Sequence, residues 1–151
     1  MKKGNVLSTR SKSGGLLMNS DIVLNKVQTI HRCLKRINEE YYSSPASLND
    51  YTRQDSIILN LLRACETCID LAMHIVSEKS LEVPQKSKDA FEILFRNGII
   101  DKELQEKLKA MVGFRNIAVH DYQAISIAIV KGIVENHLDD FKAFADIALK
   151  L

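Results

Sequence analysis

The sequence predicts an all-α protein. The chain has 151 residues, 46% hydrophobic and 26% charged, which is typical of a globular protein with one core. It contains six glycines and two prolines, too few breakers for the many turns of an all-β fold. Apolar residues recur every three or four positions over most of the chain, which is the period of amphipathic helices. We therefore expect long helices packed around one core.

The first expected helix begins after Asn19-Ser20-Asp21, which supplies N-cap side chains, and runs to about Tyr42. Its apolar positions form one stripe that would face a partner helix: Val23, Val27, Ile30, Leu34, Ile37 and Tyr41. Residues 1–18 are basic, rich in Gly and Ser, and lack the apolar region of a secretion signal. We expect residues 1–18 to form a flexible tail and residues 19–151 to form a single helical domain.

The second expected helix follows the breaker segment 43–47, starts near Thr52 or Asp55, and ends near Glu78. One side of it is broadly apolar, and the other carries a polar line that is either a solvated surface or the wall of a cleft: Ser56, Asn60, Arg63, Thr67, Asp70 and His74. The chain has three cysteines, all in apolar helical pattern: Cys33, Cys65 and Cys68. Their odd number indicates buried thiols rather than disulfides or a metal site.

The remaining elements are a shorter helix from a Ser87 cap to Asn97-Gly98, a fourth helix capped by Asp101, and a last helix capped by Ser126. The stripe of the fourth helix comprises Leu104, Leu108, Met111, Val112 and Val119, with Arg115 in its middle. The stripe of the last helix comprises Val130, Val134, His137, Phe141, Phe144 or Ala145, and Ala148.

Charge and hydropathy exclude some classes of protein. The net charge of +2 gives no global cationic field, so a role with nucleic acid must rest on a local site. No run of about 18 apolar residues exists, so no transmembrane helix is expected. We expect a cytoplasmic protein that does not bind membranes.

The segment from Arg115 to Tyr122 carries the densest chemistry of the chain. A guanidinium on a core-facing stripe is costly unless it meets an anion or opens onto a cleft. His120 lies about 140° further around an ideal helix, so the two side chains cannot aim at one point. Either the helix ends near His120 and the chain turns through Asp121 to Ile125, or two copies of the protein assemble the complete site.

These residue types suit the cleavage of RNA. Imidazole exchanges protons near neutral pH, and a guanidinium binds phosphate and stabilises charge that develops on it. No nucleophilic Ser or Cys and no cluster of carboxylates lies nearby, which favours attack by the 2′-OH of the RNA itself, without a metal or another cofactor. The products would be a 2′,3′-cyclic phosphate and a free 5′-OH. A simpler interpretation is a helix end at which cations are favoured by the helix dipole.

The string from Arg115 to Tyr122 resembles the signature Arg, four residues, His, one residue, Tyr of the HepT-like toxins of the HEPN superfamily, including the polar residue after the Arg, here Asn116. The resemblance extends from about Asn19 to Ala148, with residues 54–60 and 111–114 as further similar segments. It implies an antiparallel helical bundle of the HEPN type, with four to five helices, that dimerises with an active-site cleft between the protomers.

The resemblance also implies roles. Arg115 and His120 match the catalytic residues of a metal-independent endoribonuclease, the toxin of a toxin–antitoxin pair. Tyr122 matches the tyrosine that receives AMP from an MntA-type minimal nucleotidyltransferase antitoxin, in a homodimer or a larger hetero-oligomer. Since a phenol is a nucleophile only once deprotonated, we expect the partner to supply the base and the metal. The attached AMP would then fill space that RNA would use.

Six further residues are candidates for supporting roles: Asn116, Asp121, Asn60, Arg63, Glu66 and Asp70. Those of the second helix would wall the cleft and orient His120. Two alternatives remain open. In one, the protein is a non-catalytic subunit that presents a substrate or nucleotide to a nucleotidyltransferase. In the other, it is a helical adaptor in which Arg115 is fully buried and pairs with Asp70 or Glu66.

Overall fold

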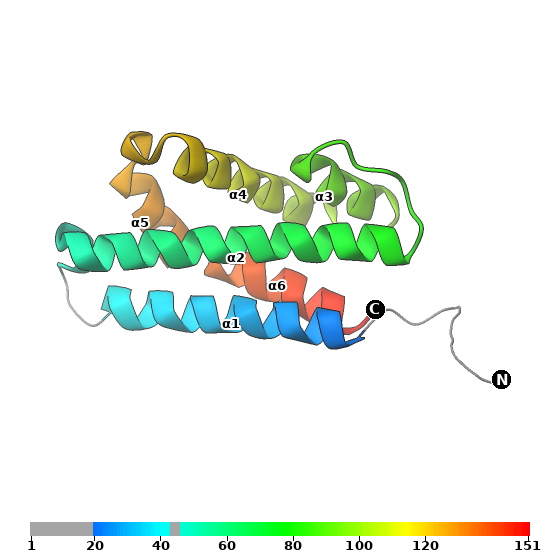
Figure 1. Ribbon diagram of the computed structural model, residues 1–151, viewed down its shortest axis with the longest axis horizontal. Helices are drawn as coiled ribbons and strands as arrows, with labels where there is room; N and C mark the ends of the chain where they lie inside the picture. Colours follow the sequence, from blue (N-terminus) through cyan, green and yellow to red (C-terminus); the bar gives the residue numbers. More distant parts are fainter. Residues whose placement is uncertain (1–19, 43–45) are drawn as a thin grey trace.

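The computed structural model describes residues 20–42 and 46–151, and in these residues it contains six α-helices and no strand (Figure 1). The all-α prediction is therefore confirmed, while the expected tail at residues 1–18 lies outside the described residues. The helices are α1 (Ser20–Tyr42), α2 (Tyr51–Glu78), α3 (Ser87–Arg96), α4 (Lys102–His120), α5 (Ile127–Asn136) and α6 (Leu138–Leu149), with short 3₁₀ turns η1 (Ser47–Asn49) and η2 (Tyr122–Ala124).

The long helices α1 and α2 lie side by side and antiparallel, and α6 packs behind them (Figure 1). α3 and α4 pack on the other side of α2, and α5 closes one end of the bundle. One continuous apolar core joins all six helices. No helix in the described part of the chain is long and apolar enough to cross a membrane.

Side-chain caps mark the starts of three helices. Ser126 caps α5 as predicted, because its Oγ accepts the N–H of Ile129 at 3.4 Å. Asp101 caps α4 as predicted, because its Oδ1 accepts the N–H of Leu104 at 2.8 Å. α2 begins at Tyr51, slightly earlier than expected, because the Asp50 side chain accepts the backbone N–H groups of Thr52 and Arg53. α1 ends at Tyr42 as predicted, but Ser20 and Asp21, expected before the helix, are its first two described residues.

The start of α3 differs from the prediction. Ser87 is the first helical residue rather than the cap, and Lys86 occupies the cap position. The capping contact comes from a side chain within the helix, because Asp89 Oδ2 accepts the backbone N–H groups of Gln85 at 2.9 Å and Lys86 at 3.1 Å. The Ser87 hydroxyl is therefore available for a contact with another helix. The helix ends as predicted, before Gly98 with its positive φ of 74°.

The predicted last helix is two helices, so residues 20–42 and 46–151 contain six helices instead of four or five. His137 leaves the helical conformation, with φ −128° and ψ 4°, and separates α5 from α6. Asp140 in the first turn of α6 is buried, and its Oδ2 lies 3.0 Å from His137 Nδ1. A carboxylate at this position favours a new helix N-terminus. The apolar stripe runs through the break, which explains why periodicity does not reveal it.

Two smaller expectations have opposite outcomes. The three cysteines are buried free thiols, as predicted, and burial raises the pKa of Cys65 to about 12. Val119, in contrast, is 51% exposed instead of lying on the buried stripe.

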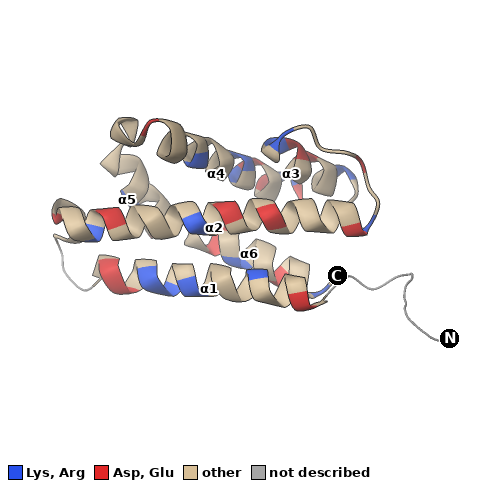
Figure 2. Cartoon of the chain, viewed as in Figure 1, with Lys and Arg blue, Asp and Glu red and all other residues tan. Residues whose placement is uncertain are grey.

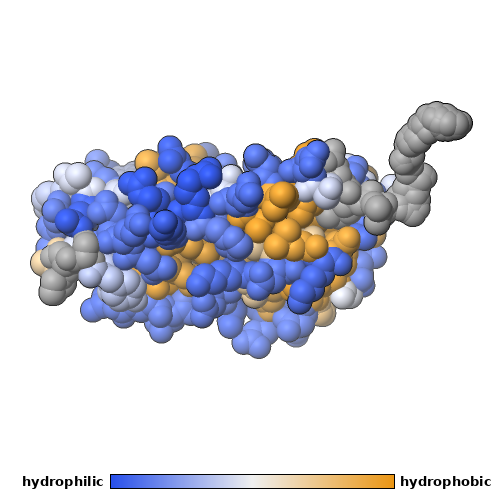
Figure 3. Space-filling model, turned by 90° about the horizontal axis from the view of Figure 1, so that it is seen from below, coloured by the Kyte–Doolittle hydropathy of each residue, from blue (hydrophilic) through white to orange (hydrophobic). Residues whose placement is uncertain are grey.

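The surface on the α1 side is largely hydrophilic, with an apolar area towards the end where α1 begins and α6 ends (Figure 3).

Candidate active site at the end of α4

Arg115 lies on the side of α4 that packs against α2 and α3. Its Nη1 donates to Glu66 Oε1 of α2 at 2.9 Å, and its Nη2 donates to Ser87 Oγ of α3 at 2.9 Å. Its Nε is buried, with no hydrogen-bond partner among the described residues. The structure thus supplies the anion that a cation on a core-facing stripe requires.

The side chain of Arg115 is nevertheless 21% exposed, and that of Glu66 is 46% exposed. The guanidinium is therefore oriented by two helices while part of it remains at the surface. An incoming phosphate would share Arg115 with Glu66 or displace it. The adaptor alternative requires a fully buried Arg115, and the observed exposure does not meet this requirement.

His120 is the last residue of α4 and is exposed. The helix continues unbroken to His120, and the Asp121 N–H bonds Ile117 O at 2.8 Å before the chain turns into η2. The helix thus ends near His120, as one of the two alternatives required. However, Arg115 and His120 remain about 140° apart around the helix. One chain alone does not aim both side chains at one point.

Between and beside these two residues, α4 presents an exposed arc. It comprises Asn116, Ile117, Val119 and His120, and Asp121 follows it, also exposed. Ile117 and Val119 are large, apolar and exposed, and they lie about 160° apart around the helix. In the part of the chain that the structure describes, no hydrogen bond engages the imidazole of His120.

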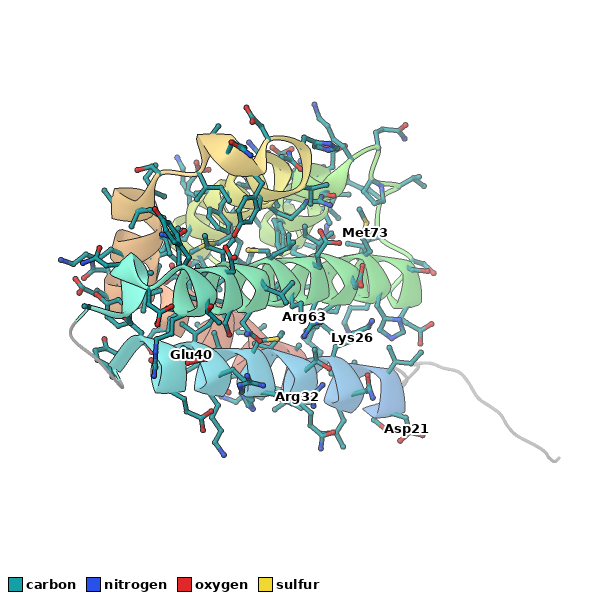
Figure 4. All side chains as sticks on the ribbon, turned by 60° about the vertical axis from the view of Figure 1, so that its left-hand side comes forward. Asp21, Lys26, Arg32, Glu40, Arg63 and Met73 are labelled. Atoms are coloured by element: carbon teal, nitrogen blue, oxygen red, sulfur yellow. The ribbon has the colours of Figure 1, made fainter. Side chains whose placement is uncertain are left out.

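Of the four candidates on α2, only Glu66 contacts Arg115. Asn60 is buried and its Nδ2 donates to Ser56 O of the same helix at 2.9 Å. Asp70 pairs with Lys26 of α1 at 3.6 Å. Arg63 lies on this same α1 edge of α2, whereas Met73 lies on the opposite edge (Figure 4). Arg63 and Asp70 therefore lie towards α1, not towards the end of α4.

Tyr122 is the first residue of η2 and is 46% exposed. Its hydroxyl donates to Asp55 Oδ1 of α2 at 2.5 Å. Burial of the phenol, together with this hydrogen bond and the negative charge of Asp55, raises the pKa of Tyr122 to about 12. Asp55 was expected only near the start of the second helix and not among the site residues. It lies three helical turns before Glu66, and this spacing puts both carboxylates on the same side of α2.

An apolar groove of about 650 Å³ runs between α4 and α5. Glycines from both helices form part of its floor, and a Cβ added at either would meet nothing within 4 Å: Gly113 and Gly132. Ile117 and Ile129 are exposed beside it. Figure 2 shows few charged residues on the second half of α4 and on α5. The described residues contain no cluster of three or more His, Cys, Asp or Glu that could hold a metal ion.

Comparisons with known proteins show what the whole chain is similar to. The chain is 49% identical over 128 residues to the mRNA nuclease HepT of Shewanella oneidensis, covering 85% of this chain and 96% of the relative. It superposes with a TM-score of 0.82 on a tri-AMPylated Shewanella oneidensis HEPN toxin in complex with its MNT antitoxin, at 48% identity, covering 87% of this chain and 98% of that one. A toxin–antitoxin structure with AMP-PNP gives 0.83 at 47% identity, covering 87% and 99%.

An all-α bundle with Arg and His five residues apart at the end of a long helix, superposing on a HEPN toxin, is a HEPN-type protein. More narrowly, the model of the family Ribonuclease HepT-like matches residues 21–147. The chain belongs to this family, as the resemblance in the sequence predicted.

Proposed function

We propose that this protein is an endoribonuclease that acts as the toxin of a toxin–antitoxin pair. The observation that carries the proposal is the pair Arg115 and His120 at the exposed end of α4, in a chain 49% identical to an mRNA nuclease. The substrate would be RNA in the cytoplasm, and mRNA is the first candidate. Both residue types suit this reaction, and both are at least partly accessible.

In the proposed reaction, Arg115 binds the scissile phosphate and stabilises the additional negative charge on it. His120 accepts the proton of the ribose 2′-OH, whose oxygen attacks the phosphorus. The bond to the 5′-oxygen breaks, and this oxygen receives a proton from solvent, to which His120 later returns the proton that it accepted. The products are a 2′,3′-cyclic phosphate and a 5′-OH. The nucleophile comes from the substrate, so the reaction requires no metal-bound water.

We propose further that the working form is a homodimer with the site between the protomers. A second copy would bring the Arg115 of one chain towards the His120 of the other, since they diverge by about 140° on one helix. The exposed Ile117 and the groove between α4 and α5 that it lines offer an apolar surface for this contact.

The proposed regulator is an MntA-type nucleotidyltransferase antitoxin that transfers AMP to Tyr122. A relative 48% identical to this chain is tri-AMPylated and bound to an MNT antitoxin. Tyr122 is 46% exposed two residues after His120, so an enzyme can reach its ring. The transferred AMP adds an anionic phosphate and a nucleotide where RNA would approach, which would switch cleavage off.

The decisive experiment compares purified parent protein with Arg115→Ala and His120→Ala on end-labelled RNA. Both variants should lose at least about 10²-fold in cleavage rate and lose toxicity on expression. His31→Ala and Arg32→Ala, which alter exposed residues of α1, are matched controls and should behave as the parent. If all four variants cleave like the parent, the nuclease assignment is wrong.

Product analysis tests the mechanism separately. The proposal requires 2′,3′-cyclic phosphate and 5′-OH ends, formed equally well with excess EDTA. A substrate with 2′-deoxyribose at the cleaved position should remain intact. Cleavage of that substrate, or a requirement for Mg²⁺, would show that the nucleophile is not the 2′-OH.

A further inference from the structure

The hydrogen bond between Tyr122 and Asp55 joins η2 to α2 across 67 positions of the chain. Tyr122, Gln123 and Ala124 are all exposed. Among the described residues, no other side-chain hydrogen bond links these three to the bundle. The hydrogen bond is thus a specific surface contact that connects η2 to α2, and it does not depend on packing in the core.

We propose that Asp55 positions the Tyr122 hydroxyl for AMP transfer and takes its proton, so that this chain supplies the base for its own modification. The inference rests on the proposed transfer of AMP to Tyr122. It differs from the expectation drawn from the sequence, in which the partner supplies the base. The partner would still bring the nucleotide and its metal.

Geometry supports the positioning role. The hydroxyl has one proton, and that proton is committed to Asp55 Oδ1 at 2.5 Å. A phenol O–H lies close to the ring plane, so the hydrogen bond fixes the direction of the oxygen lone pairs and leaves them free. With Tyr122 46% exposed, an attacking direction towards a docked nucleotide remains open. Holding a reacting atom in this way reduces the entropy cost of the reaction.

The chemistry supports the proton transfer. A phenol with a pKa of about 12 is almost entirely neutral at pH 7, so its proton must leave during the attack rather than before it. The Tyr122 oxygen would form a bond to the α-phosphorus of ATP while the bond from this phosphorus to the bridging oxygen breaks. Pyrophosphate leaves with the electron pair of that bond. The phenol proton moves to Asp55 and is later lost to solvent.

The hydrogen bond between Tyr122 and Asp55 would also be broken by the modification. After transfer, the tyrosine oxygen carries no proton and cannot donate to Asp55. An anionic phosphate then lies next to a carboxylate, and like charges repel. The tie between η2 and α2 is therefore lost when AMP is added, and residues 122–124 become free to move.

The chain contains a matched control for this contact. The Tyr41 hydroxyl of α1 donates to the carboxylate of Glu135 in α5, so a second tyrosine–carboxylate pair exists away from Tyr122. Glu135→Gln removes one negative charge and one such carboxylate, as Asp55→Asn does. It leaves Tyr122 and Asp55 untouched.

The experiment uses the full chain, ATP–Mg²⁺ and the MNT antitoxin of the Shewanella oneidensis complex as transferase. Initial rates of AMP incorporation are measured by intact mass at several ATP concentrations and pH values, and the site is located by fragment mass. Variants are Asp55→Asn, which retains an acceptor oxygen but no base, Asp55→Ala, Asp55→Glu, Glu135→Gln and Tyr122→Phe. Circular dichroism checks that each variant is folded.

We expect Asp55→Asn and Asp55→Ala to lower kcat roughly 10²-fold with KM for ATP within about twofold, while Asp55→Glu restores part of the rate and Glu135→Gln matches the parent. The rate of Asp55→Asn should rise about tenfold per pH unit as hydroxide replaces the missing base. Parent-like rates in Asp55→Asn, or a change in KM alone, would overturn the inference while the proposed function stands. A parent that takes no AMP, or takes it elsewhere than on Tyr122, would overturn the proposed regulation and the inference together.

Discussion

Arg115 Nη1 and Glu66 Oε1 lie 2.9 Å apart and join α4 to α2 across 49 positions of the chain. The pair satisfies a cation on a packed helix face and keeps its guanidinium in one orientation. It also places a carboxylate where a phosphate would bind. Glu66 therefore orients the proposed phosphate-binding group and competes with its ligand.

The Arg115–Glu66 pair should contribute measurably to stability. Glu66→Gln removes the negative charge while Arg115 remains only 21% exposed, so we expect a loss of about 1 kcal/mol in the free energy of unfolding by urea. Glu82→Gln is the control, because it breaks the ion pair with Arg96 on the open surface. Equal effects of the two substitutions would show that the partial burial of Arg115 has no energetic consequence.

Arg115→Lys should not preserve activity. A lysine ammonium cannot donate from two separated nitrogen atoms to Glu66 and Ser87 and also bind phosphate in a fork. We expect RNA cleavage to fall roughly 10- to 100-fold, with the loss mainly in kcat. Arg32→Lys on α1 serves as the matched control. Full activity of Arg115→Lys would mean that only a positive charge is needed.

Local sequence patterns predict much of the fold. Apolar periodicity locates α1, and Asp101 marks the start of α4, because these signals act within a few residues. The break at His137 has no such signal, since the apolar stripe continues through it. Periodicity reports which side of a helix is buried, not whether the helix is continuous.

The candidate site is predictable only in part. The spacing of Arg115 and His120 showed that they diverge on one helix, and the structure agrees. The partners of the site are long-range pairs: Glu66 with Arg115, and Asp55 with Tyr122. Which polar residues of α2 face α4 depends on how the two helices pack, and a helical pattern does not contain this information. The helical pattern alone does not separate Glu66 from the other polar candidates of α2, which are Asn60, Arg63 and Asp70.

The Tyr122–Asp55 contact should stabilise the protein at neutral pH and lose this effect in alkali. Tyr122 has a pKa of about 12 in the folded protein against an ordinary value near 10. A raised pKa means that the stabilisation is fully present below pH 10 and disappears as the pH rises through about 12. The difference in free energy of unfolding between the parent and Tyr122→Phe should thus shrink between pH 9 and 11.5. A difference that grows over this range would contradict the assignment.

The face formed by α4 and α5 should be the dimer contact. Ile117→Glu places a charge beside the apolar groove and should convert a dimer to monomer, with loss of RNA cleavage and an unchanged helical spectrum. Leu24→Glu introduces the same charge at an exposed leucine of α1 and should leave the dimer intact. Sedimentation equilibrium measures both. A parent that is monomeric yet active would exclude the shared site.

Mixing two inactive variants tests whether the site draws residues from both chains. A heterodimer of Arg115→Ala and His120→Ala has one site that lacks both residues and one that contains both, provided that Arg115 of one chain works with His120 of the other. Random exchange makes about half of the dimers mixed, each with one intact site, so about a quarter of the parent activity should return. If both residues act within one chain, every site in the mixture lacks one of them and no activity returns. The subunits are exchanged by unfolding and refolding the mixture. Arg115→Ala alone, unfolded and refolded in the same way, provides the baseline activity.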